Sequence, residues 1–131
     1  MSRREIREQI FKILFRVEFH EREDMPEQLQ LFMEELGQEE NKDTRYIQEK
    51  YGNILERIGE LDAMVNQVAQ GWKTSRMGKA DLAIIRLAVY EMKFEEDVPE
   101  GVAINEAVEL AKSYGTDDSP SFVNGVLAKL V

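Results

Sequence analysis

The sequence has 131 residues, enough for one folded domain with its own hydrophobic core. Hydrophobic residues make up 43% and charged residues 33%, a balance typical of folded globular domains rather than disordered chains. The chain contains no cysteine and no long apolar run, which excludes disulfides, cysteine-ligated zinc and a membrane-spanning helix. Its first residues also lack the apolar segment of a secretory signal, so we expect a cytoplasmic protein without membrane association.

The charge distribution is uneven. A net charge of −9 argues against a general nucleic-acid binder. Residues 1–17, however, contain five basic and two acidic residues, whereas residues 18–71 contain five basic and 14 acidic residues. An acidic body suppresses non-specific phosphate binding, so any RNA site should be confined to the basic amino-terminal region. From charge alone, a solvated helix face remains the simpler explanation of this region.

Apolar residues recur at helical spacing along the whole chain, which predicts an all-α fold with about seven helices. The first helix is expected over residues 3–20, where Ser2 and Glu5 have the spacing of a capping box. One of its two apolar stripes is aromatic and consists of Phe11, Phe15 and Phe19. Two stripes indicate that this helix contacts neighbours on more than one side.

Proline and glycine separate the next helices. A second helix is expected to begin near Pro26 and to stop at Gly37. A third should follow with Asp43 or Thr44 as its cap, and Gly59 should interrupt it before a fourth helix. The sixth helix should end at Gly115, and the last helix should begin at the Ser119–Pro120 pair.

A helix is expected over residues 79–94, and its residues 82–90 are apolar on all sides, which is typical of a helix at the centre of a domain. Arg86 is the one charge within the apolar stretch, and a buried guanidinium needs a partner. Glu91 and Glu106 are candidates. We expect a structural ion pair rather than a ligand contact.

No arrangement of residues suggests catalysis. His20 is the only histidine, so metal binding lacks clustered ligands, and a dipole partner at a helix end is its simplest interpretation. No glycine-rich loop has a phosphate-binding pattern. We therefore expect no enzyme activity, no metal and no cofactor.

The start of the first helix has features that an RNA site can use. Arg3 and Arg7 are four residues apart and share a face, with Arg4 beside them. The free amides of a helix start add partial positive charge. Phe15 or Phe122 could stack on an unpaired base, although a core position is the simpler interpretation of either ring.

The carboxyl-terminal half resembles the NusB family of transcription antitermination factors. The resemblance rests on Trp72 and on residues 80–91 (ADLAIIRLAVYE), 97–99 (DVP), 102–112 (VAINEAVELAK), 114–115 (YG), 118–119 (DS) and 122–127 (FVNGVL). The amino-terminal half matches more loosely, through Arg3, Arg4, Arg7 and the Leu14–Phe15 pair.

This resemblance implies one NusB-like RNA-binding domain over residues 1–131, with two three-helix bundles packed around a shared central helix. It implies binding of boxA RNA in nascent ribosomal transcripts as a heterodimer with NusE, a ribosomal protein. Other Nus factors and RNA polymerase would be indirect partners. A homodimer of this chain stays open as an alternative assembly.

The resemblance also implies roles for individual residues. The family's arginine-rich amino terminus matches Arg3, Arg4 and Arg7, which implies phosphate contacts. Phe15 replaces a common tyrosine and keeps only its stacking face, while Ile10 replaces a common alanine. The RNA surface would also include Asp118, Ser119 and Phe122, and Asp81 would lie near NusE. The short basic segment suggests weak affinity for RNA without NusE.

Two alternatives stay open. One is a fragment of a ribosomal-RNA cytosine methyltransferase, whose amino-terminal domain resembles NusB. The other is a helical protein-interaction module with no RNA role. Binding to boxA RNA with and without NusE separates the second from the antitermination hypothesis.

Overall fold

A computed structural model describes residues Met1 to Val131. It contains seven α-helices, three short 3₁₀-helices and no strand, which confirms the predicted all-α fold. The α-helices are α1 (Arg3–Arg16), α2 (Met25–Leu36), α3 (Lys42–Glu56), α4 (Ile58–Val68), α5 (Lys79–Phe94), α6 (Glu100–Tyr114) and α7 (Ser119–Ala128). The 3₁₀-helices are η1 (Val17–Phe19), η2 (Arg22–Asp24) and η3 (Thr74–Arg76). None of the helices is both long and apolar enough to cross a membrane.

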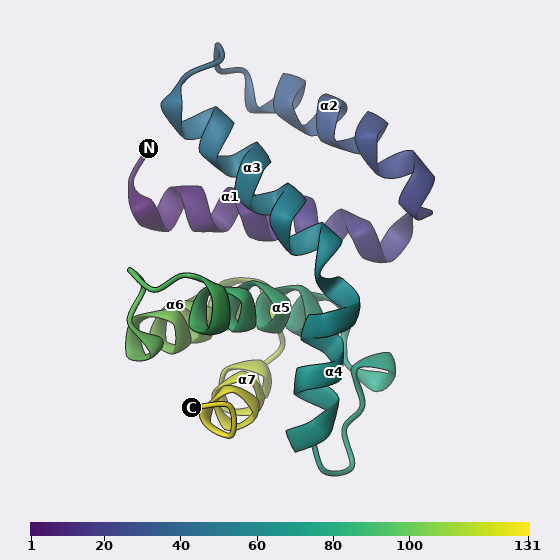
Figure 1. The fold of residues 1–131 in the computed structure, drawn as a ribbon, viewed down its shortest axis with the longest axis vertical. Coiled ribbons are helices and arrows are strands. Elements are labelled where there is room, and N and C mark those ends of the chain that lie inside the picture. Colours follow the sequence, from purple (N-terminus) through teal and green to yellow (C-terminus); the bar gives the residue numbers. More distant parts are fainter. The chain divides into compact units, whose positions relative to one another are not determined.

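The chain divides into two compact units, Met1–Leu55 and Glu56–Val131. The first contains α1 to α3 and the second contains α4 to α7. In the first unit, α2 and α3 run in opposite directions, and α3 crosses in front of α1 in this view (Figure 1). The expected shared central helix stays a prediction, because it concerns the arrangement of both units together.

The predicted capping box at the start of α1 is confirmed. The Glu5 amide donates to Ser2 Oγ at 3.1 Å, and the Ser2 amide donates to Glu5 Oε1 at 3.2 Å. The helix ends at Arg16 rather than at residue 20, because its last turn tightens into η1. The predicted stop of α2 at Gly37 is also confirmed.

Two predicted boundaries are wrong. The cap of α3 is Asn41, whose Oδ1 accepts from the Thr44 amide at 3.0 Å. Thr44 Oγ1 accepts in return from the Asn41 amide at 2.8 Å, so an asparagine–threonine pair makes the two bonds of a capping box. The break after α3 lies at Arg57, and Gly59 is already inside α4. A single glycine is tolerated in a helix at a cost of about 1 kcal/mol, so it does not fix a boundary.

Within the second unit, α5 is the central helix, as its apolar sequence predicted. It packs against α4, α6 and α7, and every residue from Leu82 to Met92 is buried. Arg86 is 8% exposed, and its Nε and Nη2 donate to the two carboxylate oxygens of Asp62 at 2.9 and 2.8 Å. The expected structural ion pair is confirmed, with a partner on α4 that the sequence did not suggest.

Candidate nucleic-acid interface

The first candidate surface is the start of α1. Arg3 and Arg4 are exposed and Arg7 is half-buried, all within the first two turns of the helix. The capping box holds these turns in helical geometry. Its hydrogen bonds from Ser2 also hold the pKa of Glu5 below its usual range, so Glu5 stays ionised at neutral pH. The result is a formed helix end with three guanidinium groups beside one fixed carboxylate.

An aromatic series follows the arginines along α1. Arg4 and Phe15 are eleven residues apart, which is about three helical turns and places both on one side of α1. The Phe15 ring is half-buried and meets the Phe19 ring edge-on, with centroids 5.0 Å apart. Phe19 is 55% exposed. Cations on α1 and an accessible aromatic ring on the adjoining η1 therefore occur on one continuous segment, which is the combination that single-stranded RNA sites use.

The second candidate surface is the start of α7, in the other unit. Asp118 is exposed and is the residue before the helix, and Phe122 is half-buried in the first turns. Ser119 is only 2% exposed, and its Oγ accepts from the Thr116 amide at 2.9 Å. Its hydroxyl therefore fixes the loop between α6 and α7, and in this way positions the exposed Asp118.

The predicted RNA residues fall into two sets. Arg3, Arg4, Arg7 and Phe15 share α1, whereas Asp118, Ser119 and Phe122 share the start of α7. Asp81 lies in the first turn of α5 and is half-buried, with its Oδ1 buried and without a hydrogen-bond partner. Sequence reasoning missed the exposure of Phe19 and Trp72. Each follows a helix end, where an aromatic residue need not face a core.

Gly115 is required by the tight α6–α7 loop. A Cβ atom there would lie 2.4 Å from Ser119 Cβ and Oγ and 2.8 Å from the Ala111 carbonyl oxygen. Gly115→Ala should therefore push Ser119 away, break its bond to Thr116 and lower the free energy of unfolding by about 1 to 3 kcal/mol. Chemical denaturation followed by circular dichroism measures this loss.

Gly125→Ala is the matched control, because nothing lies within 4 Å of a Cβ atom at Gly125. This glycine is inside α7, so the same substitution should stabilise the helix by about 0.5 to 1 kcal/mol. Equal effects of the two substitutions would show that the α6–α7 loop is not sterically limited at Gly115.

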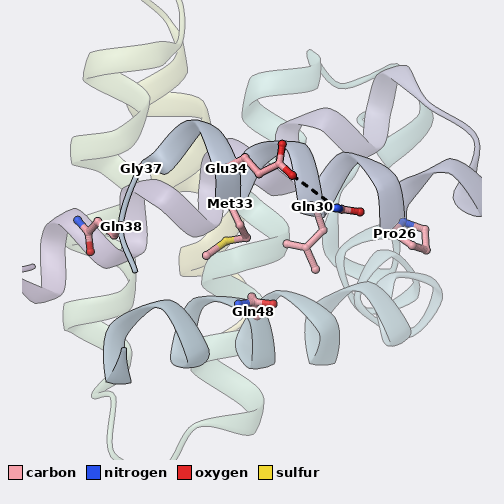
Figure 2. A pocket seen from close by; sticks show the side chains of 8 residues that line it. Pro26, Gln30, Met33, Glu34, Gly37, Gln38 and Gln48 are labelled. Carbon is pink, nitrogen blue, oxygen red and sulfur yellow. Dashed lines mark hydrogen bonds between the residues drawn. The ribbon is translucent and has the colours of Figure 1, made fainter. Parts of the chain in front are cut away.

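A shallow pocket between α2 and α3 offers a different kind of surface (Figure 2). It has a volume of about 490 Å³ and is lined by Pro26, Leu29, Gln30, Met33, Glu34, Gly37, Gln38 and Gln48. Gln30 Nε2 donates to Glu34 Oε1 at 3.5 Å on its α2 side. The lining has one carboxylate and no cation, so it does not suit a phosphate backbone.

The chain is similar to known proteins along nearly its whole length. The NusB family model matches residues 4–131. A transcription antitermination protein NusB from Agathobacter rectalis is 57% identical over 129 residues, covering 98% of each chain. The solved structure of T. maritima NusB superimposes with a TM-score of 0.86 at 34% identity, covering 99% of this chain and 90% of that one.

A structure of the antitermination factors NusB and NusE in complex with double-stranded RNA also has this fold. It gives a TM-score of 0.83 at 24% identity and covers 96% of this chain and 92% of that one. At that identity the likeness concerns the fold. The family match over nearly the whole chain and the identity to the curated relative establish that this chain belongs to the NusB family of transcription antitermination proteins.

Proposed function

We propose that this chain binds the boxA element of nascent ribosomal RNA as a heterodimer with NusE, and that it acts as one RNA-binding domain over residues 1–131. The complex would assemble with other Nus factors on RNA polymerase, which places the protein in the cytoplasm. The observation that carries this proposal is the capped start of α1, with Arg3, Arg4 and Arg7 ahead of an accessible aromatic series.

Each set of residues has a distinct chemical role in this proposal. The guanidinium groups of α1 contact phosphates, and Phe15 offers a ring edge or face to a base. At α7, Phe122 stacks on a second base. Asp118 accepts a hydrogen bond from a base amino group or a 2′-hydroxyl, because its carboxylate repels phosphate. Ser119 positions Asp118 through its bond to Thr116.

The partner proposal rests on charge and on the related complex. Residues 18–71 contain 14 acidic and five basic residues, and an acidic surface attracts a basic ribosomal protein. A NusB of this fold has been solved with NusE and double-stranded RNA. We place the NusE contact near Asp81, at the start of α5. The antitermination role of the 57% identical relative favours this function over that of a methyltransferase fragment.

A ternary binding assay tests the function. Fluorescein-labelled boxA RNA is titrated with the protein alone, with NusE alone and with both, and fluorescence anisotropy gives each Kd. We expect weak binding by the protein alone and at least tenfold tighter binding by the pair. A scrambled RNA of equal length and composition is the control. Equal affinities for boxA and scrambled RNA, or no binding at low ionic strength, would contradict the proposal.

A further inference from the structure

The connection between α4 and α5 has an exposed tryptophan among positive charges. Trp72 is 55% exposed, although tryptophan is a large apolar residue. Residues 72–79 contain three cations, Lys73, Arg76 and Lys79, and no acidic residue. All three cations are exposed. In a chain with a net charge of −9, this is a second local basic segment, separate in sequence from α1.

The connection is held in place by its own hydrogen bonds. Gly71, with φ 76°, lets the chain turn after α4. Asn66 Oδ1 then accepts from the Thr74 amide at 2.8 Å, and Asn66 Nδ2 donates to Thr74 Oγ1 at 3.2 Å. Lys73 Nζ donates to the Asn66 carbonyl oxygen at 3.3 Å. Trp72 is therefore presented by a fixed turn, which limits the conformational entropy lost when a ligand binds.

Trp72 lies next to a residue already placed in the RNA surface. Its ring meets the Phe122 ring edge-on, with centroids 5.4 Å apart and an interplanar angle of 67°. We infer that Trp72, Lys73 and Arg76 form a further part of the RNA site, in which an unpaired base stacks on the indole while the two cations contact the adjoining phosphates. This inference rests on the proposed RNA-binding function and adds a third segment of chain to it.

Charge favours RNA over a protein at this surface. The exposed cations Lys73 and Arg76, which precede α5, would attract phosphates and would repel a basic ribosomal protein. Asp117 and Asp118 precede Phe122 and are exposed, so they disfavour phosphate at the start of α7. The RNA backbone would therefore follow Lys73 and Arg76, and the bases would face Trp72 and Phe122. Alternating cations and aromatic rings are typical of single-stranded RNA sites.

The fluorescence of Trp72 tests the contact directly, because it is the only tryptophan in the chain. Single-stranded boxA RNA is titrated into the full-length protein with tryptophan-free NusE present, and indole emission is recorded beside the anisotropy of labelled RNA. We expect emission to be quenched with the same Kd as the anisotropy change. A stacked base emits no fluorescence of its own, so the indole emission reports on Trp72 alone.

Variants measured by anisotropy separate stacking from charge. Trp72→Ala should weaken RNA binding at least fivefold, since one base–aromatic stack contributes about 1 to 3 kcal/mol. Trp72→Phe keeps a ring face and should recover most of this loss. Lys73→Gln/Arg76→Gln should reduce the slope of log Kd against log salt by about 1.4, or about 0.7 for each phosphate contact. The matched control, Arg45→Gln/Lys129→Gln, removes two exposed charges elsewhere and should leave the slope unchanged.

The results of these experiments separate the inference about Trp72 from the proposed RNA-binding function. If labelled RNA binds normally while Trp72 emission and the Trp72→Ala affinity stay unchanged, the inference is wrong and the proposed function stands. If no RNA binds to the wild-type protein with NusE, the proposed function itself fails. A Trp72→Ala variant that loses NusE affinity but keeps RNA affinity would assign this surface to the protein partner. The thermal melts of both Trp72 variants verify that they are folded.

Discussion

Replacing Asp62 with alanine should lower the melting temperature by about 10 °C, which corresponds to a loss of about 3 kcal/mol in the free energy of unfolding. Arg86 is 8% exposed and donates two hydrogen bonds to the Asp62 carboxylate, at 2.9 and 2.8 Å. Alanine would leave the guanidinium buried in the apolar α5 without this carboxylate. Removing one partner of a buried ion pair destabilises a protein by more than an exposed ion pair stabilises it. Thermal unfolding followed by circular dichroism at 222 nm measures the change.

A double variant shows whether the charge itself causes the loss. Asp62→Leu/Arg86→Met removes both charges and keeps apolar volume, so its stability should lie within about 1 kcal/mol of the wild type. The single Arg86→Met variant should also melt lower, while its affinity for boxA RNA stays unchanged. Normal stability with lost RNA binding in Arg86→Met would place Arg86 in the ligand site instead. An Asp62→Ala melting temperature within 2 °C of the wild type would show that the pair is not needed.

The second large effect concerns the arginines of α1. Arg4→Ala/Arg7→Ala should weaken boxA binding at least tenfold at about 0.1 M salt and reduce the salt slope by about 1.4. The physical reason is the loss of two phosphate contacts, each of which releases counterions on binding. The double variant should keep its melting temperature, because Arg4 is exposed and Arg7 is half-buried on a helix whose cap is unchanged. Anisotropy titrations at four salt concentrations give both quantities.

Arg45→Ala/Lys129→Ala is the control for this pair, since both side chains are exposed and both variants change the net charge equally. We expect it to shift affinity by less than threefold and to leave the salt slope intact. If both double variants gave the same curves, the effect would be one of overall charge. If neither changed binding, the RNA site would lie away from α1.

Most of the fold was predictable because helical periodicity is local. The bounds of α5 were predictable because an apolar run over residues 82–90, interrupted only by Arg86, lies at its centre. Boundaries were less certain where two local signals compete. Asn41 replaced Thr44 as the cap of α3, because both side chains can accept an amide and the structure uses them reciprocally. The partner of Arg86 lies on α4, 24 residues away, and no local pattern indicates such a contact.

The candidate site was predictable in part. The arginines were found because charge asymmetry and a capping pattern are both visible in sequence. At the start of α7, the sequence does not show that Ser119 holds the loop while Asp118 and Phe122 face the surface. Only the structure shows that Ser119 is 2% exposed and that its Oγ accepts from the Thr116 amide. Trp72 was missed as a surface residue, since sequence gives no measure of which aromatic ring stays accessible. Three neighbouring cations without an acid were the available signal.

The capping box at Ser2 and Glu5 affects how readily the first turn of α1 can bind a ligand. Helix ends fray, and ordering one residue of backbone costs about 1 to 2 kcal/mol. Because the two reciprocal bonds already hold this turn, the backbone that carries the arginines is ordered before a ligand binds, and little backbone freedom is lost on contact. The hydrogen bonds from Ser2 lower the pKa of Glu5, so its carboxylate keeps this capping bond until the pH falls below the usual pKa range of a glutamate. Stronger acid would protonate Glu5, weaken this bond and let the first turn of α1 fray.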